Sequence, residues 1–142
     1  MMRSGGARAM MNLSEGRTHP PRILVVEDDS EMRGLLADEL LDEGYEIDQA
    51  VDGEDAVLKL AQDQFDLVIA DLIMPKMGGL DLLSMVRKAY PRTPVILITA
   101  FGDWQSLIQA YENGALNYIC KPFKVKELKE AVKKALNKGV EG

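Results

Sequence analysis

The sequence has little of what several protein classes require. Its single cysteine, Cys120, rules out an internal disulfide and fits a reducing cytoplasm. No apolar run approaches the length of a membrane span, so we expect a cytoplasmic protein that does not contact a membrane. Positive charge is also scarce, because 17 Lys and Arg residues are outnumbered by 23 Asp and Glu residues, which leaves a net charge of −6. Direct nucleic-acid binding by this chain is therefore disfavoured.

Two further absences limit the kinds of site that this chain could contain. The only histidine, His19, stands beside Pro20 in a Gly- and Pro-containing stretch, and we interpret it as solvated rather than as a ligand or a phosphorylation site. Neither a G-x-G-x-x-G motif nor a P-loop occurs, which disfavours a nucleotide-binding module. Residues 1–21 lack apolar periodicity and are predicted to form a disordered tail, without the hydrophobic segment of a signal peptide.

What is present is a regular alternation of strand-like and helix-like segments. The 142 residues suffice for one domain with a core. Short apolar runs predict strands at 22–26, 45–51, 65–70, 95–98 and 117–120, and amphipathic stretches predict helices at 30–43, 54–62, 80–90, 103–113 and 125–137. This order predicts an α/β fold, a doubly wound five-stranded parallel sheet with helices on both faces. The domain is expected to span 22–138, with a C-terminal tail at 139–142 because Gly139 should end the last helix.

Side chains that can do chemistry follow four of the predicted strands. They are Glu27, Asp28 and Asp29 after the first strand, Asp71 after the third, Thr99 after the fourth and Lys121 after the fifth. The C-terminal ends of parallel strands share one edge of the sheet, where open α/β sheets bind their ligands. Clustered carboxylates suit Mg²⁺ or Mn²⁺, and together with a lysine and a hydroxyl they can hold phosphoryl oxygens. Asp71 could then be a nucleophile that forms an aspartyl phosphate.

Each of these residues also has an ordinary structural explanation. Asp71 fits a helix cap or turn former, Thr99 the end of a strand, and Lys121 a surface lysine. The three consecutive carboxylates fit a solvated turn, with Ser30 as the cap of the following helix. The joint occurrence of these side chains at four strand ends favours a site over coincidence.

Four stretches make the sequence resemble the receiver domains of bacterial two-component response regulators. They are 23–29 (Ile-Leu-Val-Val-Glu-Asp-Asp), 71–79 (Asp-Leu-Ile-Met-Pro-Lys-Met-Gly-Gly), 98–100 (Ile-Thr-Ala) and 121–123 (Lys-Pro-Phe). They stand in the order and spacing of that family, and the resemblance covers about residues 22–138. It implies a flavodoxin-like (βα)5 fold and a cis bond between Lys121 and Pro122.

The resemblance also implies how phosphate would be bound and sensed. Asp71 corresponds to the phosphoacceptor, and Thr99 and Lys121 correspond to the hydroxyl and the lysine that contact the phosphoryl group. Tyr118 corresponds to the aromatic switch residue. In the family this residue couples phosphate to a surface formed by the fourth helix, the fifth strand and the fifth helix.

For the metal, the resemblance implies a ligand set around Asp71. Glu27 and Asp28 correspond to the acidic pair that holds Mg²⁺, with Asp28 as the direct ligand, and Asp29 is expected to lie outside the metal shell. The backbone carbonyl of Ile73 corresponds to a further ligand.

The apolar Ile73 side chain cannot steer a water molecule, and neither can Phe101, so we predict slow loss of phosphate by hydrolysis.

We therefore expect a stand-alone signalling switch that takes phosphate from a sensor histidine kinase or a histidine phosphotransfer protein and controls a partner protein. Apart from catalysing its own phosphorylation and slow self-dephosphorylation, it is not expected to be an enzyme. One alternative is the receiver part of a longer transcriptional regulator. Another is a phosphohydrolase with an Asp nucleophile, although Ile73 stands where those enzymes need a second Asp.

Overall fold

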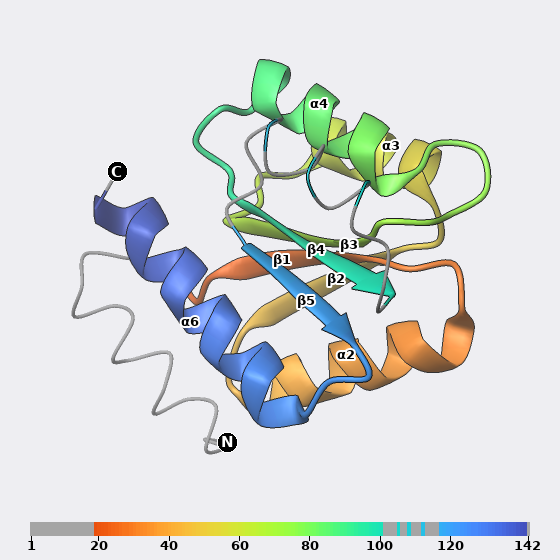
Figure 1. The fold of residues 1–142 in the computed structure, drawn as a ribbon. Helices are drawn as coiled ribbons and strands as arrows, with labels where there is room; N and C mark the ends of the chain where they lie inside the picture. Colours follow the sequence, from red (N-terminus) through yellow and green to blue (C-terminus); the bar gives the residue numbers. More distant parts are fainter. Residues whose placement is uncertain (1–18, 101–104, 106–107, 109–111, 113–116, 142) are drawn as a thin grey trace.

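Strands and helices alternate along the chain in a computed structural model, which describes residues 19–100, 105, 108, 112 and 117–141 (Figure 1). The strands are β1 (Arg22–Val26), β2 (Glu46–Ala50), β3 (Leu67–Asp71), β4 (Val95–Ala100) and β5 (Asn117–Lys121). The helices are α2 (Ser30–Asp42), α3 (Gly53–Gln62), α4 (Gly79–Ala89) and α6 (Val125–Glu141). The five predicted strands are confirmed.

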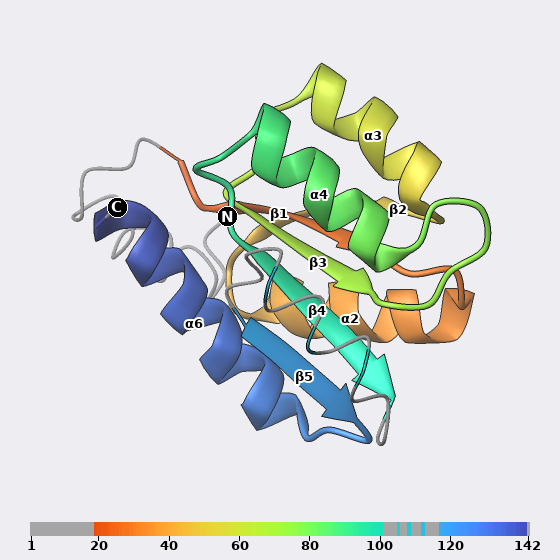
Figure 2. The same cartoon turned by 45° about the horizontal axis from the view of Figure 1, so that its top comes forward.

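The strands form one parallel sheet in the order β2-β1-β3-β4-β5, which Figures 1 and 2 show from two sides. The strand order reverses between β1 and β3, because the chain leaves β1 outward to β2 and then returns to the other side of β1. Val26 and Ala70 are register partners across this point. Glu27 and Asp71, the next residues of the two chains, therefore emerge side by side at the place where open sheets bind ligands.

Alternate strand residues point into two separate cores. Helices α3 and α4 cover one face of the sheet, and α2 and α6 cover the other (Figure 1). Leu24, Val68 and Leu97 point toward α3 and α4. Ile23 and Ile69 point toward α2 and α6. Both faces of these strands are buried, which is why the sequence shows continuous apolar runs there rather than alternation.

The helix ends agree with the predictions at one glycine and differ at another. Gly44 follows α2 with φ 97°, a conformation that favours glycine, so it ends the helix as predicted. The prediction that Gly139 ends the last helix was wrong, because α6 continues to Glu141. A glycine inside a helix costs about 1 kcal/mol relative to alanine, but it keeps its backbone hydrogen bond and need not end the helix.

Two predicted segments lie wholly or partly outside the described residues. Of the predicted helix at 103–113 the structure describes Gln105, Ile108 and Glu112, which are helical. Of the predicted tail at 1–21 it describes the last three residues. Pro21 is buried, and its carbonyl accepts a hydrogen bond from the Glu46 amide at 2.9 Å. The predicted tail thus includes at least one residue that packs and hydrogen-bonds with the sheet.

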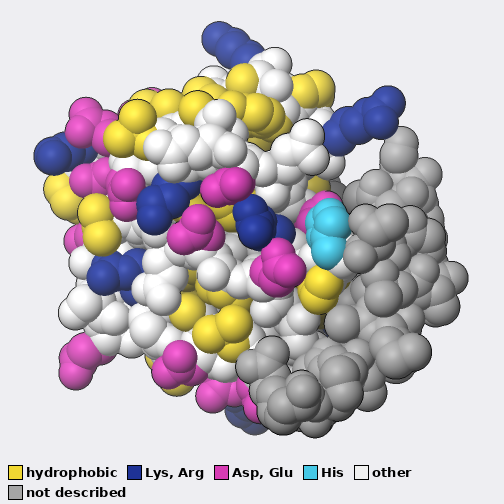
Figure 3. All heavy atoms as spheres, turned by 180° about the vertical axis from the view of Figure 1, so that it is seen from behind, with side chains coloured by type: hydrophobic (Ala, Val, Ile, Leu, Met, Phe, Trp, Pro, Cys, Tyr) yellow, Lys and Arg dark blue, Asp and Glu magenta, His cyan; other side chains and the backbone are white. Residues whose placement is uncertain are grey.

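One face of the molecule is mixed in charge. On the face shown in Figure 3, acidic and basic side chains lie interspersed, and neither sign gathers into an extended patch. None of the helices described is both long enough and apolar enough to cross a membrane.

Candidate functional site

Glu27 leaves the end of β1 and is fixed mainly through its backbone. Its amide donates to the Ala50 carbonyl at the end of β2 (3.1 Å), and its own carbonyl accepts from the Arg33 guanidinium (2.9 Å). The carboxylate is buried, with 1% of the residue exposed, and its Oε2 atom accepts from the Asp29 amide at 3.1 Å. A buried carboxylate is thus placed at the sheet edge with one oxygen bound and the other available.

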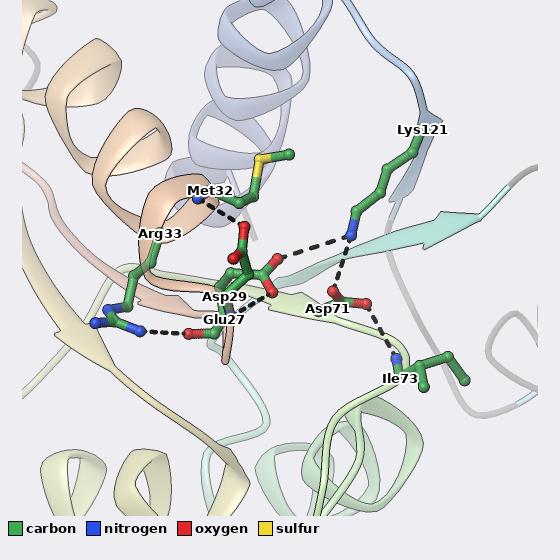
Figure 4. A network of polar contacts seen from close by, with 7 residues as sticks. All are labelled: Glu27, Asp29, Met32, Arg33, Asp71, Ile73 and Lys121. Carbon is green, nitrogen blue, oxygen red and sulfur yellow. Dashed lines mark hydrogen bonds and ion pairs between the residues drawn. The ribbon is translucent and has the colours of Figure 1, made fainter.

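Asp71 ends β3 and is held from two directions, as Figure 4 shows. Its Oδ2 atom accepts from the Lys121 ammonium at 3.0 Å, and its Oδ1 atom accepts from the Ile73 amide at 3.1 Å. Only 7% of the residue is exposed. The carboxylate is therefore oriented by a charge on β5 and by the backbone of its own following loop.

Negative charge exceeds positive charge at this edge. Oxygen atoms from Glu27, Asp28 and Asp71 lie within 4.8 Å of one another. The nearby cation is Lys121, whose Nζ atom is 3.9 Å from Glu27 Oε1 as well as 3.0 Å from Asp71. Burial raises the pKa of Glu27 to about 7; the Asp71 carboxylate adds to this rise, while the Asp29 amide and the Lys121 charge oppose it.

The pKa of Lys121 is also raised, which for a lysine favours the charged form. Partial burial acts to lower the pKa of Lys121, but the hydrogen bond and the charge of Asp71, with the charge of Glu27, outweigh burial and raise that pKa. Lys121 is therefore fully charged at neutral pH. One ammonium still cannot balance three carboxylates, so the site as a whole has an affinity for a further cation.

The donor set fits a hard divalent metal ion. Glu27 Oε1 is buried and has no hydrogen-bond partner, and a buried polar atom without a partner is costly. The exposed Asp28 carboxylate opens the cluster to solvent, which gives an ion a route of entry. Carboxylate oxygens are hard ligands of the kind that Mg²⁺ binds together with water molecules. The predicted role of the Ile73 carbonyl stays a prediction.

Thr99 and Tyr118 lie on the neighbouring strands β4 and β5. Thr99 is buried, and its hydroxyl donates to the neighbouring Ala100 carbonyl at 3.4 Å. Tyr118 on β5 is 43% exposed and is the register partner of Leu97 on β4. The described contacts thus join Glu27, Asp71 and Lys121 directly, whereas the parts assigned to Thr99 and Tyr118 stay predictions.

Two residues near the site have roles that the sequence reasoning did not assign. Asp29, rather than the predicted Ser30, caps α2, because its Oδ2 atom accepts from the Met32 amide at 3.0 Å. Arg33 holds the Glu27 carbonyl and also donates to the Gln49 side chain at 3.2 Å. An arginine in the second turn of a helix gives no sequence signal that it folds back onto the preceding loop. The Lys121–Pro122 bond is cis, as the resemblance implied.

Comparison with known proteins places these features in one family. Residues 23–133 match the sequence profile of the response regulator receiver domain. The response regulator protein FleR of Pseudomonas aeruginosa is 43% identical over 112 residues, which are 78% of this chain and 24% of FleR. The transcriptional regulatory protein ResD of Bacillus subtilis is 36% identical over 122 residues, 86% of this chain and 50% of ResD.

Solved structures agree with the sequence relatives. A CheY-like response regulator receiver domain protein from Methanospirillum hungatei superposes with a TM-score of 0.82 and 29% identity, covering 86% of this chain and 98% of that one. The chain thus spans between a quarter and a half of these two curated relatives, but nearly the whole of a solved receiver domain.

Proposed function

This chain belongs to the response regulator receiver domain family, and we propose that it accepts a phosphoryl group on Asp71 from a sensor histidine kinase or a histidine phosphotransfer protein. The observation that supports this most is the pairing of Asp71 with Lys121 at 3.0 Å beside two further carboxylates. The nucleophile is thereby fixed, and a positive charge lies where phosphoryl oxygens would arrive.

The transfer itself needs little from the protein beyond position and charge. One Asp71 oxygen attacks phosphorus and forms a P–O bond. The P–N bond of the phosphohistidine breaks, its electron pair stays on the imidazole nitrogen, and that nitrogen takes a proton from water. Lys121 turns from the carboxylate to the new phosphoryl oxygens, since its charge is then shared with the group that carries most of the negative charge.

The metal belongs to the same proposal. The carboxylates of Glu27, Asp28 and Asp71 would hold Mg²⁺ or Mn²⁺ together with the Ile73 carbonyl, and the ion would offset negative charge on the phosphoryl oxygens. Glu27 contributes the buried oxygen that otherwise lacks a partner. Asp28 would supply the carboxylate ligand on the solvent-exposed side of the cluster.

Phosphorylation would change the conformation of Thr99 on β4 and Tyr118 on β5. The phosphoryl group carries about −1.5 to −2 charge in place of the single carboxylate charge of Asp71, and it brings three acceptor oxygens. The Thr99 hydroxyl would leave the Ala100 carbonyl and donate to one of those oxygens. Tyr118, on the adjacent strand, then repacks and alters the surface of β5 and α6 that a partner protein recognises. Phosphate shifts this equilibrium only through contacts that differ between the two conformations.

Loss of phosphate is expected to be slow. Ile73 is 64% exposed beside the acceptor, and its side chain is apolar. No hydrogen-bonding side chain is offered at this position, whereas hydrolysis needs an oriented water. The same residue argues against a phosphohydrolase, which would need a second carboxylate there.

A second candidate concerns the whole protein rather than this domain. FleR and ResD are full regulators, and the chain covers 24% and 50% of them. This coverage favours a receiver that controls a further part of a longer transcriptional regulator. The length of the native polypeptide on an immunoblot distinguishes this arrangement from a receiver that acts alone.

The test of the central proposal is Mg²⁺-dependent labelling by acetyl phosphate. We expect stoichiometric, hydroxylamine-labile labelling of the wild type and none of Asp71→Ala. Asp38→Ala, which removes an exposed carboxylate from α2, is the matched control and should be labelled like the wild type. Equal labelling of Asp71→Ala and the wild type would remove the proposal.

A further inference from the structure

The loop between β3 and α4, residues 72–78, carries Ile73 and is closed tightly at its far end. The Gly79 amide donates to the Leu72 carbonyl at 2.9 Å. A Cβ atom on Gly79 would lie 2.6 Å from the Asp71 carbonyl oxygen and 2.8 Å from the Leu72 Cα atom. This end of the loop therefore rests directly on the backbone of the acceptor residue, and the hydrogen bond to Leu72 holds it there.

The other support of this loop comes from the N-terminus of α3. A Cβ atom on Gly53 would lie 2.5 Å from the Met77 carbonyl oxygen and 2.6 Å from its Cβ atom. Gly53 cannot retreat, because Asp52 caps α3 by accepting from the Asp55 amide at 2.8 Å. In turn, Asp55 accepts from the Val51 amide at 3.0 Å, which ties the start of α3 to the end of β2.

Lys76 adds a second contact between the same two segments. Its Nζ atom lies 3.9 Å from Asp52 and 3.8 Å from Glu54, both at the start of α3. Its backbone has φ 64°, which a lysine rarely adopts and which persists only where the surroundings impose it. The ion pairs are largely exposed and weak. The close backbone contact of Gly53 with Met77 is therefore the stronger restraint.

We propose that Gly53 is a positioning residue for the metal, because its contact with Met77 fixes the loop that presents the Ile73 carbonyl. This inference rests on the proposed function, in which Ile73 supplies a metal ligand. Any side chain at Gly53 must push Met77, and the loop cannot yield toward Gly79, so the displacement travels back toward Ile73. Substituting a residue that holds a metal ligand in position typically weakens metal binding by about 10- to 100-fold.

The test compares Gly53→Ala with Gly34→Ala. Both replace a helical glycine by a better helix former. A Cβ atom on Gly34 would meet nothing within 4 Å, so this variant controls for helix propensity alone. We measure Mg²⁺ dissociation constants by titration calorimetry and the melting temperature of each metal-free protein. The expected result is Mg²⁺ binding at least about tenfold weaker in Gly53→Ala, with Gly34→Ala equal to the wild type.

The outcomes separate this inference from the proposed function. Wild-type protein that binds no Mg²⁺ would overturn both. Wild-type protein that binds Mg²⁺ and is labelled on Asp71, with an unchanged dissociation constant in a folded Gly53→Ala, would overturn the positioning role alone. A Gly53→Ala protein that melts many degrees lower but binds Mg²⁺ normally when folded would show that the contact is merely structural.

If Gly53→Ala does not fold, a measurement on the wild type tests the positioning role of Gly53 instead. Coupling is reciprocal, so metal binding must stabilise the contact that positions the metal. We expect Mg²⁺ to slow hydrogen exchange at the Asp55 and Ala56 amides, which bond to Asp52. The Glu43 and Gly44 amides at the far end of α2 serve as the internal reference. Equal slowing at both places, or none at either, would overturn the proposal.

Discussion

Replacing Glu27 by Gln should stabilise the metal-free protein at alkaline pH. The wild-type carboxylate is buried with an oxygen that lacks a hydrogen-bond partner, and it lies close to the Asp71 carboxylate. Its pKa rises from 4.5 to about 7 on folding. The folded state therefore binds this proton more tightly than the unfolded chain does. The contribution of Glu27 to stability is complete below pH 4.5 and is lost as pH rises through 7.

The size of the effect follows from the rise in the pKa of Glu27. At about 1.4 kcal/mol per pKa unit, the ionised carboxylate lowers the free energy of unfolding by at most about 3 kcal/mol well above pH 7. For a domain of this size, 1 kcal/mol corresponds to roughly 3–4 °C in melting temperature. Glu27→Gln should therefore melt up to about 10 °C above the wild type at pH 8.5 and at nearly the same temperature at pH 4.5.

Circular dichroism melts from pH 4.5 to 8.5, with and without Mg²⁺, test this prediction. A Mg²⁺ concentration of about 100 times the dissociation constant adds roughly 2.7 kcal/mol to a protein that binds it, so the ion should recover most of the wild-type loss. It should add little to Glu27→Gln. The exposed Glu130→Gln on α6 is the control and should follow the wild type. Parallel melting curves for Glu27→Gln and the wild type across this pH range would refute the reasoning.

Two smaller predictions concern neighbours of the site. Ile73→Asn should lose phosphate about fivefold faster, because one hydrogen bond to the attacking water contributes about 1 kcal/mol. The decay of labelled protein measures this rate, and an unchanged half-life would contradict the role given to Ile73. Asp29→Ala should lower the free energy of unfolding by about 1 kcal/mol in urea titrations, because the Met32 amide loses its cap, while Asp29→Ser should lose a few tenths at most. Equal losses in the two variants would show that the cap contributes nothing.

Strand periodicity could have predicted which strand-end residues meet. Glu27 stands two residues after Val25, Asp71 two after Ile69, and Lys121 two after Ile119, and those three apolar residues share the core beneath α2 and α6. Residues two apart on a strand point to the same face. Glu27, Asp71 and Lys121 therefore belong together before any coordinate is known.

The same periodicity assigns the proposed sensing residues to the other face of the sheet from Glu27, Asp71 and Lys121. Thr99 stands two residues after Leu97, which belongs to the core beneath α3 and α4, and Tyr118 is the register partner of Leu97. By this periodicity Thr99 and Tyr118 belong to the face opposite that of Glu27, Asp71 and Lys121. This placement suits a residue pair that passes a change at the acceptor to another surface.

Other features could not be read from the sequence because competing choices have nearly equal energies or depend on distant contacts. Asp29 and Ser30 are both good caps, and the preference between them depends on how the β1–α2 loop leaves the sheet. Gly139 can end a helix or continue it at a cost of about 1 kcal/mol. The contact of Gly53 with Met77 joins segments more than twenty residues apart, and no local pattern marks either residue as part of a site.

The charge balance at the sheet edge dictates an order of events. Three carboxylates and one ammonium leave an excess of negative charge, and burial, with the Asp71 charge as a smaller contribution, raises the pKa of Glu27 to about 7. Phosphorylation would replace the single charge of the Asp71 carboxylate by a group of about −1.5 to −2, a net gain of up to about one negative charge at the same place. Above pH 7, where Glu27 is ionised, the phosphorylated site is therefore stable only with an added cation, whereas the unphosphorylated site already has reason to bind one. Metal binding should precede phosphorylation, and the requirement for metal should become stricter as pH rises through 7.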